Sequence, residues 1–152
     1  MSAADQSGIP MPEPPRGVQR VERLTDLRTA RQLVVNVATA CGLGAQRCAD
    51  LAVAVSEVVT NAIRHGGGSA TIFAYDGQGV VSVEVHDRAV TEIPTVPAEP
   101  PSAMTLGGRG LWLARRLCDR MEIRRHRTGN IVRLVMNLAW QVTCARVLAI
   151  GC

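Results

Sequence analysis

LAVAVSEVVTNAIRHGGG, residues 51–68, is the stretch of sequence that decides the fold of this chain. Its apolar residues recur at the spacing of an α-helix, and the resulting stripe comprises Leu51, Val55, Val58 and Ala62. We therefore expect a helix over about residues 46–65 that packs on a core along this stripe and ends at the three glycines.

Polar side chains form a second stripe on the same predicted helix. Glu57, Asn61 and His65 follow one another at four-residue steps, about a quarter-turn round from the apolar stripe. At the edge of the core they would face a cleft, where a carboxylate can act as a base and an amide oxygen can join the ligands of Mg²⁺. A solvated polar stripe beside the core produces the same pattern, so these residues alone leave both interpretations open.

The composition is typical of one globular domain. The chain has 152 residues, of which 47% are hydrophobic and 3% aromatic, so its core must rest on aliphatic side chains. No apolar run reaches the roughly 18 residues of a membrane span, and the opening segment lacks a basic, apolar signal, so we expect a cytoplasmic protein with no membrane partner. The five cysteines are widely spaced, without Cys-x-x-Cys, which argues against zinc and a disulfide framework.

All 17 basic residues are arginine. A chain without lysine can carry neither a P-loop nor a Schiff-base or general-base lysine. The formal net charge of +4 is compatible with nucleic-acid binding, but the arginines are dispersed and no aromatic residues interleave them. We therefore expect no direct contact with nucleic acid.

The rest of the chain divides by period and composition. We expect a flexible proline-rich leader at 1–17, one folded domain at 18–138 and a C-terminal extension at 139–152. Within the domain the patterns predict, in order, a strand, two helices, a hairpin, a helix and a hairpin, at residues 18–24, 25–41, 46–65, 70–87, 111–118 and 121–138. The intervening stretch 88–108 carries four prolines and is typical of a lid.

Alternation in the first hairpin predicts which side chains of its second strand enter the core. Val81, Val83 and Val85 are expected to point inward. The alternate residues of this strand are expected to point outward, namely Ser82, Glu84 and His86.

Two further polar features follow the helix. Asp87 ends a predicted strand, where a buried carboxylate can accept a hydrogen bond from an exocyclic amine, although an Asp that simply ends a strand is common. Gly107-Gly108-Arg109-Gly110 opens a predicted helix, where backbone N–H groups can approach phosphates, although a plain flexible turn also fits. The order and spacing of the three features are more specific than any one of them.

In this order the motifs resemble those of the ATPase superfamily shared by gyrase, a heat-shock chaperone, histidine kinases and the MutL mismatch-repair proteins. Residues 57–65 are similar to the N box of that superfamily, 85–87 to its first glycine box and 108–111 to its second. The chain looks most like the small anti-sigma-factor serine/threonine kinases. The resemblance implies a two-layer α/β (α+β) sandwich in which about three helices cover one face of a mixed, largely antiparallel sheet, with ATP between helices and lid.

The resemblance also implies roles for single residues. Glu57 would polarise the attacking hydroxyl or water, Asn61 would bind the Mg²⁺ that bridges the phosphates, and Asp87 would read the adenine amine. The phosphates would be cradled by Gly108 and Gly110, with the backbone around Arg109 and Leu111.

Two arginines and a histidine complete the expected site. Arg64 and Arg109 are candidates for neutralising phosphate charge, because guanidinium pairs well with phosphate. His65 either approaches the phosphates or interacts with the dipole at the end of its helix.

The function implied by the resemblance is that of an anti-sigma factor. Such a protein binds a sigma factor as a homodimer, and phosphorylates an anti-sigma-factor antagonist with ATP and Mg²⁺. The alternative is a regulatory module that binds ATP weakly or without catalysis and acts by occupying its partner. Two departures from the family pattern favour this alternative: Ala89 replaces the glycine of Asp-x-Gly, and Gly129-Asn130-Ile131 offers no hydroxyl to support Asp87.

Overall fold

The computed structural model describes residues 14–93, 96–100 and 109–138. The elements are β1 (Gly17–Val21), a short 3₁₀ turn η1 (Leu24–Asp26), α1 (Leu27–Ala40), α2 (Ala45–His65), β2 (Ala70–Gly77), β3 (Val80–Asp87), α3 (Arg109–Leu117), β4 (Arg120–His126) and β5 (Gly129–Asn137). Most of the expected leader and the whole of the expected extension at 139–152 lie outside the described residues.

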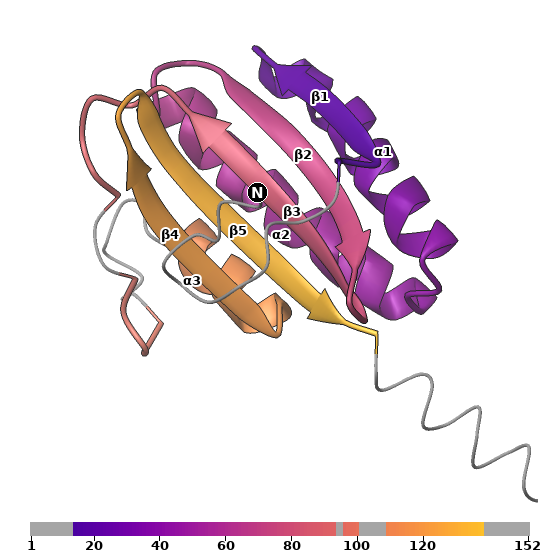
Figure 1. The fold of residues 1–152 in the computed structure, drawn as a ribbon. Helices are drawn as coiled ribbons and strands as arrows, with labels where there is room; N and C mark the ends of the chain where they lie inside the picture. Colours follow the sequence, from indigo (N-terminus) through magenta and orange to yellow (C-terminus); the bar gives the residue numbers. More distant parts are fainter. Residues whose placement is uncertain (1–13, 94–95, 101–108, 139–152) are drawn as a thin grey trace, which may run out of the picture.

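The five strands form one sheet, and the helices α1, α2 and α3 lie on one of its faces (Figure 1). The strand order is β1-β2-β3-β5-β4, and all four pairings are antiparallel. This confirms the predicted two-layer fold class, with no parallel pair among the described strands. The order makes β3 and β5 neighbours, so the end of β3 at Asp87 meets the start of β5 at Gly129.

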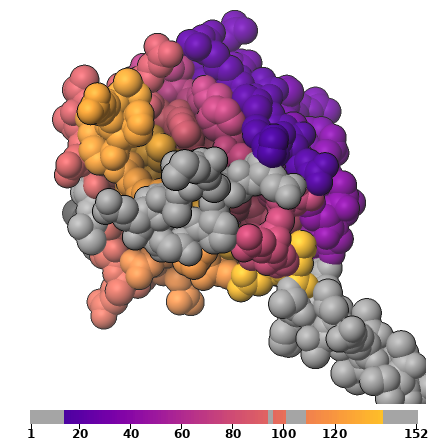
Figure 2. All heavy atoms as spheres, viewed as in Figure 1, coloured from indigo at the N-terminus to yellow at the C-terminus, as the bar shows by residue number. Residues whose placement is uncertain are grey.

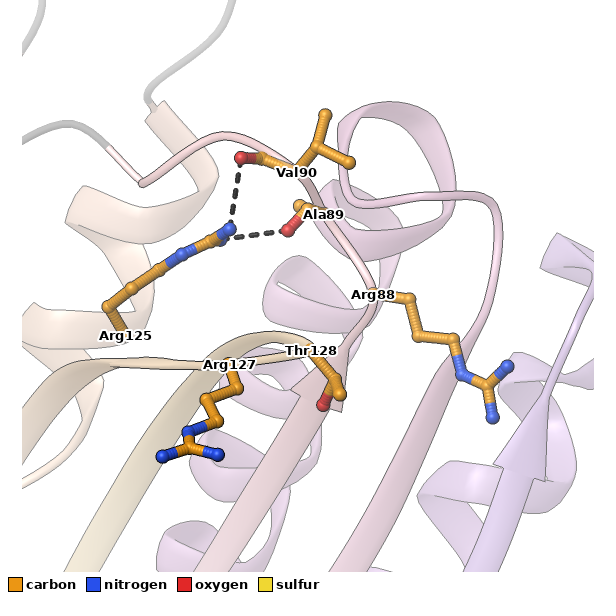
Figure 3. A pocket seen from close by; sticks show the side chains of 6 residues that line it. All are labelled: Arg88, Ala89, Val90, Arg125, Arg127 and Thr128. Carbon is orange, nitrogen blue, oxygen red and sulfur yellow. Dashed lines mark hydrogen bonds between the residues drawn. The ribbon is translucent and has the colours of Figure 1, made fainter.

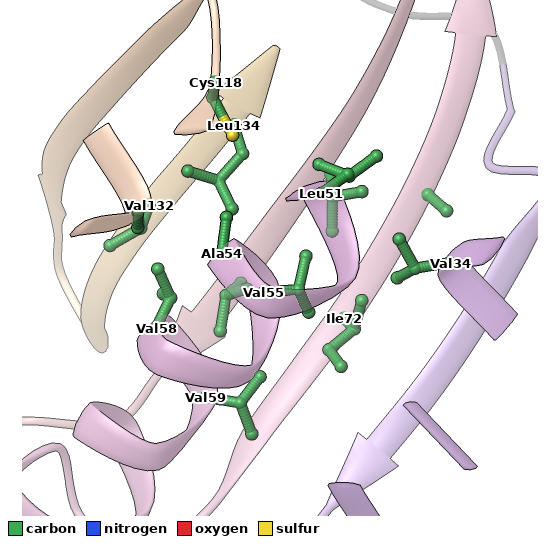
Figure 4. Packing of buried hydrophobic residues seen from close by; sticks show 14 of the residues in the cluster. Val34, Leu51, Ala54, Val55, Val58, Val59, Ile72, Cys118, Val132 and Leu134 are labelled. Atoms are coloured by element: carbon green, nitrogen blue, oxygen red, sulfur yellow. The ribbon is translucent and has the colours of Figure 1, made fainter. Parts of the chain in front are cut away.

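The predicted apolar stripe of α2 forms the centre of the core. Leu51 and Val55 are fully buried, and Val58 and Ala62 are each 2% exposed. Figure 4 shows this side of α2 packed against Ile72 of β2 and Leu134 of β5, with aliphatic side chains throughout. Because this packing fixes the rotation of α2, the second stripe of the helix is held at the edge of the core.

The helix and strand boundaries lie close to those predicted, because glycines follow both long helices and form part of the turn after β2. The expected strand at 18–24 is shorter and ends at Val21, and η1 precedes α1. In the described residues no helix is both long enough and apolar enough to cross a membrane.

Two residues of β3 on the face away from the helices are buried although we expected them to point outward. The valines at 81, 83 and 85 are buried as expected, and Ser82 and Glu84 on the other face are only 2% and 9% exposed. β3 is a central strand, so side chains of the neighbouring strands β2 and β5 flank this face as well. Glu84 lies between Phe73 and Arg133 on the neighbouring strands, and accepts a hydrogen bond from Nε2 of His86 at 2.8 Å.

The two ends of the sheet lie far apart on the molecular surface. In the space-filling view, the strand pair β4–β5 and the region of β1 and α1 occupy opposite sides of the face shown (Figure 2).

Candidate functional site

Asp87 is held in a buried hydrogen-bond network at the end of β3. The residue is 8% exposed, and its Oδ1 accepts hydrogen bonds from the backbone N–H groups of Ala89 at 2.9 Å and Asn130 at 2.8 Å. The side-chain amide of Asn130 lies 3.3 Å from each carboxylate oxygen. Since a carboxylate offers about four acceptor positions, Oδ2 retains the capacity to accept from a further donor.

Two glycines enclose this carboxylate. A Cβ atom added at Gly66, directly after α2, would stand 2.7 Å from Oδ2 of Asp87. A Cβ added at Gly129 would overlap with the main-chain carbonyl oxygen of Asp87. The end of α2 and the start of β5 therefore approach the strand end at a distance that only glycine permits.

Asn130 is a residue that the sequence analysis missed. Among the described residues no hydroxyl donates to Asp87, and the backbone and side-chain amides of Asn130 support it instead. Asn130 is 2% exposed, and its amide also donates to the carbonyl oxygen of Thr91 at 3.1 Å. The available signal was its amide group at the position after Gly129, since asparagine carries two side-chain donors.

Arg125 of β4 was missed as well, and it fixes the loop that follows β3. Its Nη1 donates to the carbonyl oxygens of Ala89 at 2.8 Å and Thr91 at 3.0 Å and to Oδ1 of Asn130 at 3.2 Å. Its Nη2 donates to the carbonyl oxygen of Val90 at 2.9 Å; Figure 3 shows the bonds to residues 89 and 90. One guanidinium thus holds both the loop and the asparagine that orients Asp87.

Glu57 reaches the first turn of α3 from the middle of α2. A Cβ added at Gly110 would stand 2.6 Å from Oε2 of Glu57, so the carboxylate lies directly against this glycine. Beside this contact is a cavity of about 350 Å³, lined by Glu57, Pro100, Arg109, Gly110, Trp112 and Leu113. The fold thus brings Glu57, Arg109 and Gly110 together at one cavity.

The other predicted site residues are distributed along the same edge. Asn61 is partly exposed one turn after Glu57, and Leu111 is 6% exposed with its side chain in the core, so only its backbone can contact a ligand. Arg64 and His65 are exposed in the last turn of α2 and make no hydrogen bond or ion pair with another described residue. Gly108 lies outside the described residues.

Comparison with known sequences decides the family. The profile of the histidine kinase-like ATPase domain matches residues 21–136. The chain belongs to this family. No curated protein matches the chain.

Solved histidine kinase-like domains share the fold. The chain is 23% identical to a structure of the RsbU and RsbW domains of Rv1364c from Mycobacterium tuberculosis, with a TM-score of 0.56 over 81% of this chain and 32% of that one. It is 21% identical to the histidine kinase domain of the blue-light-activated kinase EL346 from Erythrobacter litoralis, with a TM-score of 0.51 over 77% of this chain and 63% of that one. At these identities the similarity shows the fold alone, and the chain spans about a third of the first protein.

Family membership implies ATP as the ligand, and the donor set suits a nucleotide with its metal. Among the described residues no three His, Cys, Asp or Glu side chains gather as a metal site. Mg²⁺ in nucleotide sites typically takes one or two protein oxygens and completes its shell with phosphates and water. The partly exposed amide of Asn61, one turn from Glu57, fits this requirement.

The expected lid of this ATPase domain is anchored where it is described. Val96 is 9% exposed, and its carbonyl oxygen accepts from Nη1 of Arg115 at 3.1 Å. Nε1 of Trp112 donates to the carbonyl oxygen of Ala98 at 3.3 Å. Movement of the described parts of this stretch, residues 88–93 and 96–100, would therefore require these contacts with α3, and those of Arg125, to break.

Proposed function

We propose that this chain is an ATP-dependent protein serine/threonine kinase that acts as an anti-sigma factor. It binds a sigma factor and phosphorylates a protein antagonist of that interaction, as a cytoplasmic homodimer. The contact of Glu57 with Gly110 carries the proposal, because it places a proton acceptor beside a glycine in the first turn of α3. The family resemblance assigns phosphate binding to that glycine.

The roles of the residues follow from their placement. When bound, ATP supplies the phosphoryl group that is transferred. Glu57 orients the serine or threonine hydroxyl of the substrate and accepts its proton, which is the work of a general base. Asn61 holds Mg²⁺ through its amide oxygen, and the positive end of the α3 dipole with the Arg109 guanidinium favours the phosphate charge.

At the other end of the site, Asp87 selects adenine. Its Oδ2 accepts from the exocyclic amine, whereas the carbonyl oxygen of guanine at that position would face a second acceptor. Asn130 keeps the carboxylate in place and so takes the role of the hydroxyl that the family pattern would supply after Gly129. Both ends of the site retain their polar groups, Glu57 and Asn61 at one end and Asp87 at the other. This supports the catalytic proposal over the occupancy-only alternative.

The experiment is transfer of labelled phosphate from ATP to candidate antagonist proteins, together with titration of MgATP into the purified chain. Wild type is expected to transfer phosphate, and Glu57→Gln to bind MgATP normally while its rate falls about 10²- to 10⁴-fold. Glu22→Gln makes the same change at an exposed site near β1 and should leave the rate unchanged. Normal MgATP binding by wild type without transfer to any antagonist would favour the occupancy-only alternative.

A further inference from the structure

A second hollow lies at the ends of β3, β4 and β5, away from the cavity beside Glu57. It has a volume of about 640 Å³ and is lined by Arg88, Ala89, Val90, Arg125, Arg127 and Thr128. One wall is the loop after β3 and the other is the turn between β4 and β5 (Figure 3). We call it the arginine pocket; none of its lining residues lines the cavity beside Glu57.

Within the described residues, none of the three arginines of the pocket forms an ion pair with a carboxylate. Six other arginines form ion pairs with carboxylates, namely Arg16, Arg20, Arg47, Arg120, Arg124 and Arg133. Within the described ranges, Arg88, Arg125 and Arg127 have no carboxylate within ion-pair distance. Arg125 donates only to carbonyl and amide oxygens, so its charge adds to the potential of the pocket.

The two remaining guanidinium groups are free to receive an anion. Arg88 and Arg127 are exposed, and in Figure 3 their side chains extend on either side of Thr128. A guanidinium presents a planar set of N–H donors that matches a carboxylate in two-point geometry. The pocket therefore suits a ligand that carries more than one carboxylate.

An apolar side chain at the rim indicates that this ligand is a protein. Val90 lines the pocket and is 92% exposed, more than Val18, Leu24 or Val53, the other exposed large hydrophobic residues of the described chain. A bare anion gains nothing from it, whereas a peptide side chain can bury it. Nucleic acid fits less well, since none of the described residues that line the pocket is aromatic and could stack on a base.

We propose that the arginine pocket docks an acidic segment of a protein partner. Carboxylates of the segment pair with Arg88 and Arg127, and an apolar side chain of the same segment packs on Val90 at the rim. The interaction needs neither nucleotide nor the residues of the Glu57 cavity, so it goes beyond the proposed kinase activity. Its failure would leave that activity untouched.

The test uses a short fluorescein-labelled peptide of alternating glutamate and leucine, with fluorescence anisotropy as the readout and no nucleotide present. Wild type is expected to bind this peptide with an affinity that falls as salt is added. The double variant Arg88→Gln/Arg127→Gln should bind about 2- to 30-fold more weakly, the range expected for the loss of two exposed ion pairs. The matched control Arg28→Gln/Arg31→Gln removes the same charge from exposed positions of α1 and should bind as wild type does.

Each other outcome overturns the proposal. Equal losses in the two double variants would mean that net charge alone attracts the peptide. Absence of binding to wild type at low salt would exclude the docking site. Displacement of the peptide by inorganic phosphate at equal concentration, with no loss in Val90→Ser, would identify a small-anion site, because docking requires Val90→Ser to weaken peptide binding. Circular dichroism of each variant checks the fold.

Discussion

The two ends of the candidate site are built differently. At the Asp87 end, a buried carboxylate is bound by Ala89 and Asn130 and enclosed by Gly66 and Gly129. At the Glu57 end, a partly exposed carboxylate lies on one glycine beside an open cavity. Rigid enclosure suits recognition of a fixed base edge, whereas a reacting hydroxyl must enter and leave.

If this contrast is correct, adding one methyl group should lower the stability of the fold at the Asp87 end and the rate of phosphoryl transfer at the Glu57 end. Gly129→Ala is expected to destabilise the fold by about 3 kcal/mol, at the upper end for overpacking, because the added Cβ overlaps with main-chain atoms of Asp87 that cannot rotate away. Urea unfolding measures this. A variant as stable as wild type would show that β3 and β5 can separate there without loss.

Gly110→Ala should act on chemistry and leave stability intact. The one close contact of the added Cβ is with Oε2 of Glu57, which can swing aside, while the other atoms of this side chain stay at ordinary contact distances. Alanine also favours the helix by up to about 1 kcal/mol over glycine. Displacement of the base by about 1 Å should lower the rate of phosphoryl transfer about 100-fold. Rate and urea stability measured together test this, and an unchanged rate would contradict the assigned contact.

Asn130→Ala should lower the affinity for ATP more than the rate of phosphoryl transfer. Removing its amide leaves Asp87 less well oriented, and a lost hydrogen bond to a buried carboxylate costs about 1 to 2 kcal/mol, a 5- to 30-fold loss of ATP affinity. The preference for ATP over GTP should shrink, while the rate at saturating ATP stays close to wild type. Asn137→Ala, at an exposed position of β5, is the matched control. A fall in rate at saturating ATP without a change in selectivity would count against a positioning role.

The smallest effect is expected at Glu84, on the face of the sheet opposite the helices. Burial alone would raise the pKa of Glu84, but the hydrogen bond from His86 and the charges of His86, Arg133 and Arg124 hold this pKa below its ordinary value. A lowered pKa stabilises the fold at pH values above that ordinary value, and this stability is lost as the pH falls through the lowered pKa. Acid titration of Glu84→Gln should therefore show a shallower loss of stability below about pH 4.5, with ATP affinity unchanged. An acid profile identical to that of wild type would contradict this.

Much of the site was readable from the sequence because its signals are local. The period of α2 predicts both the buried stripe and the edge that carries Glu57 and Asn61. The boundary between β3 and its loop predicts the place of Asp87, and the glycines before α3 predict a helix start. Each of these inferences depends on residues within about two helical turns of one another.

The support of Asp87 and the contact of Glu57 were decided only by the tertiary structure. Asn130 can reach Asp87 because β5 pairs with β3 in one register, and Arg125 can reach the loop because β4 lies at the edge of the sheet. Gly110 looks like a flexible turn in the sequence, yet it lies in α3 directly against the Glu57 carboxylate of α2. Periodicity and capping act between neighbours along the chain and determined the elements, whereas the distances between elements are set by packing of the whole core, which no local pattern encodes.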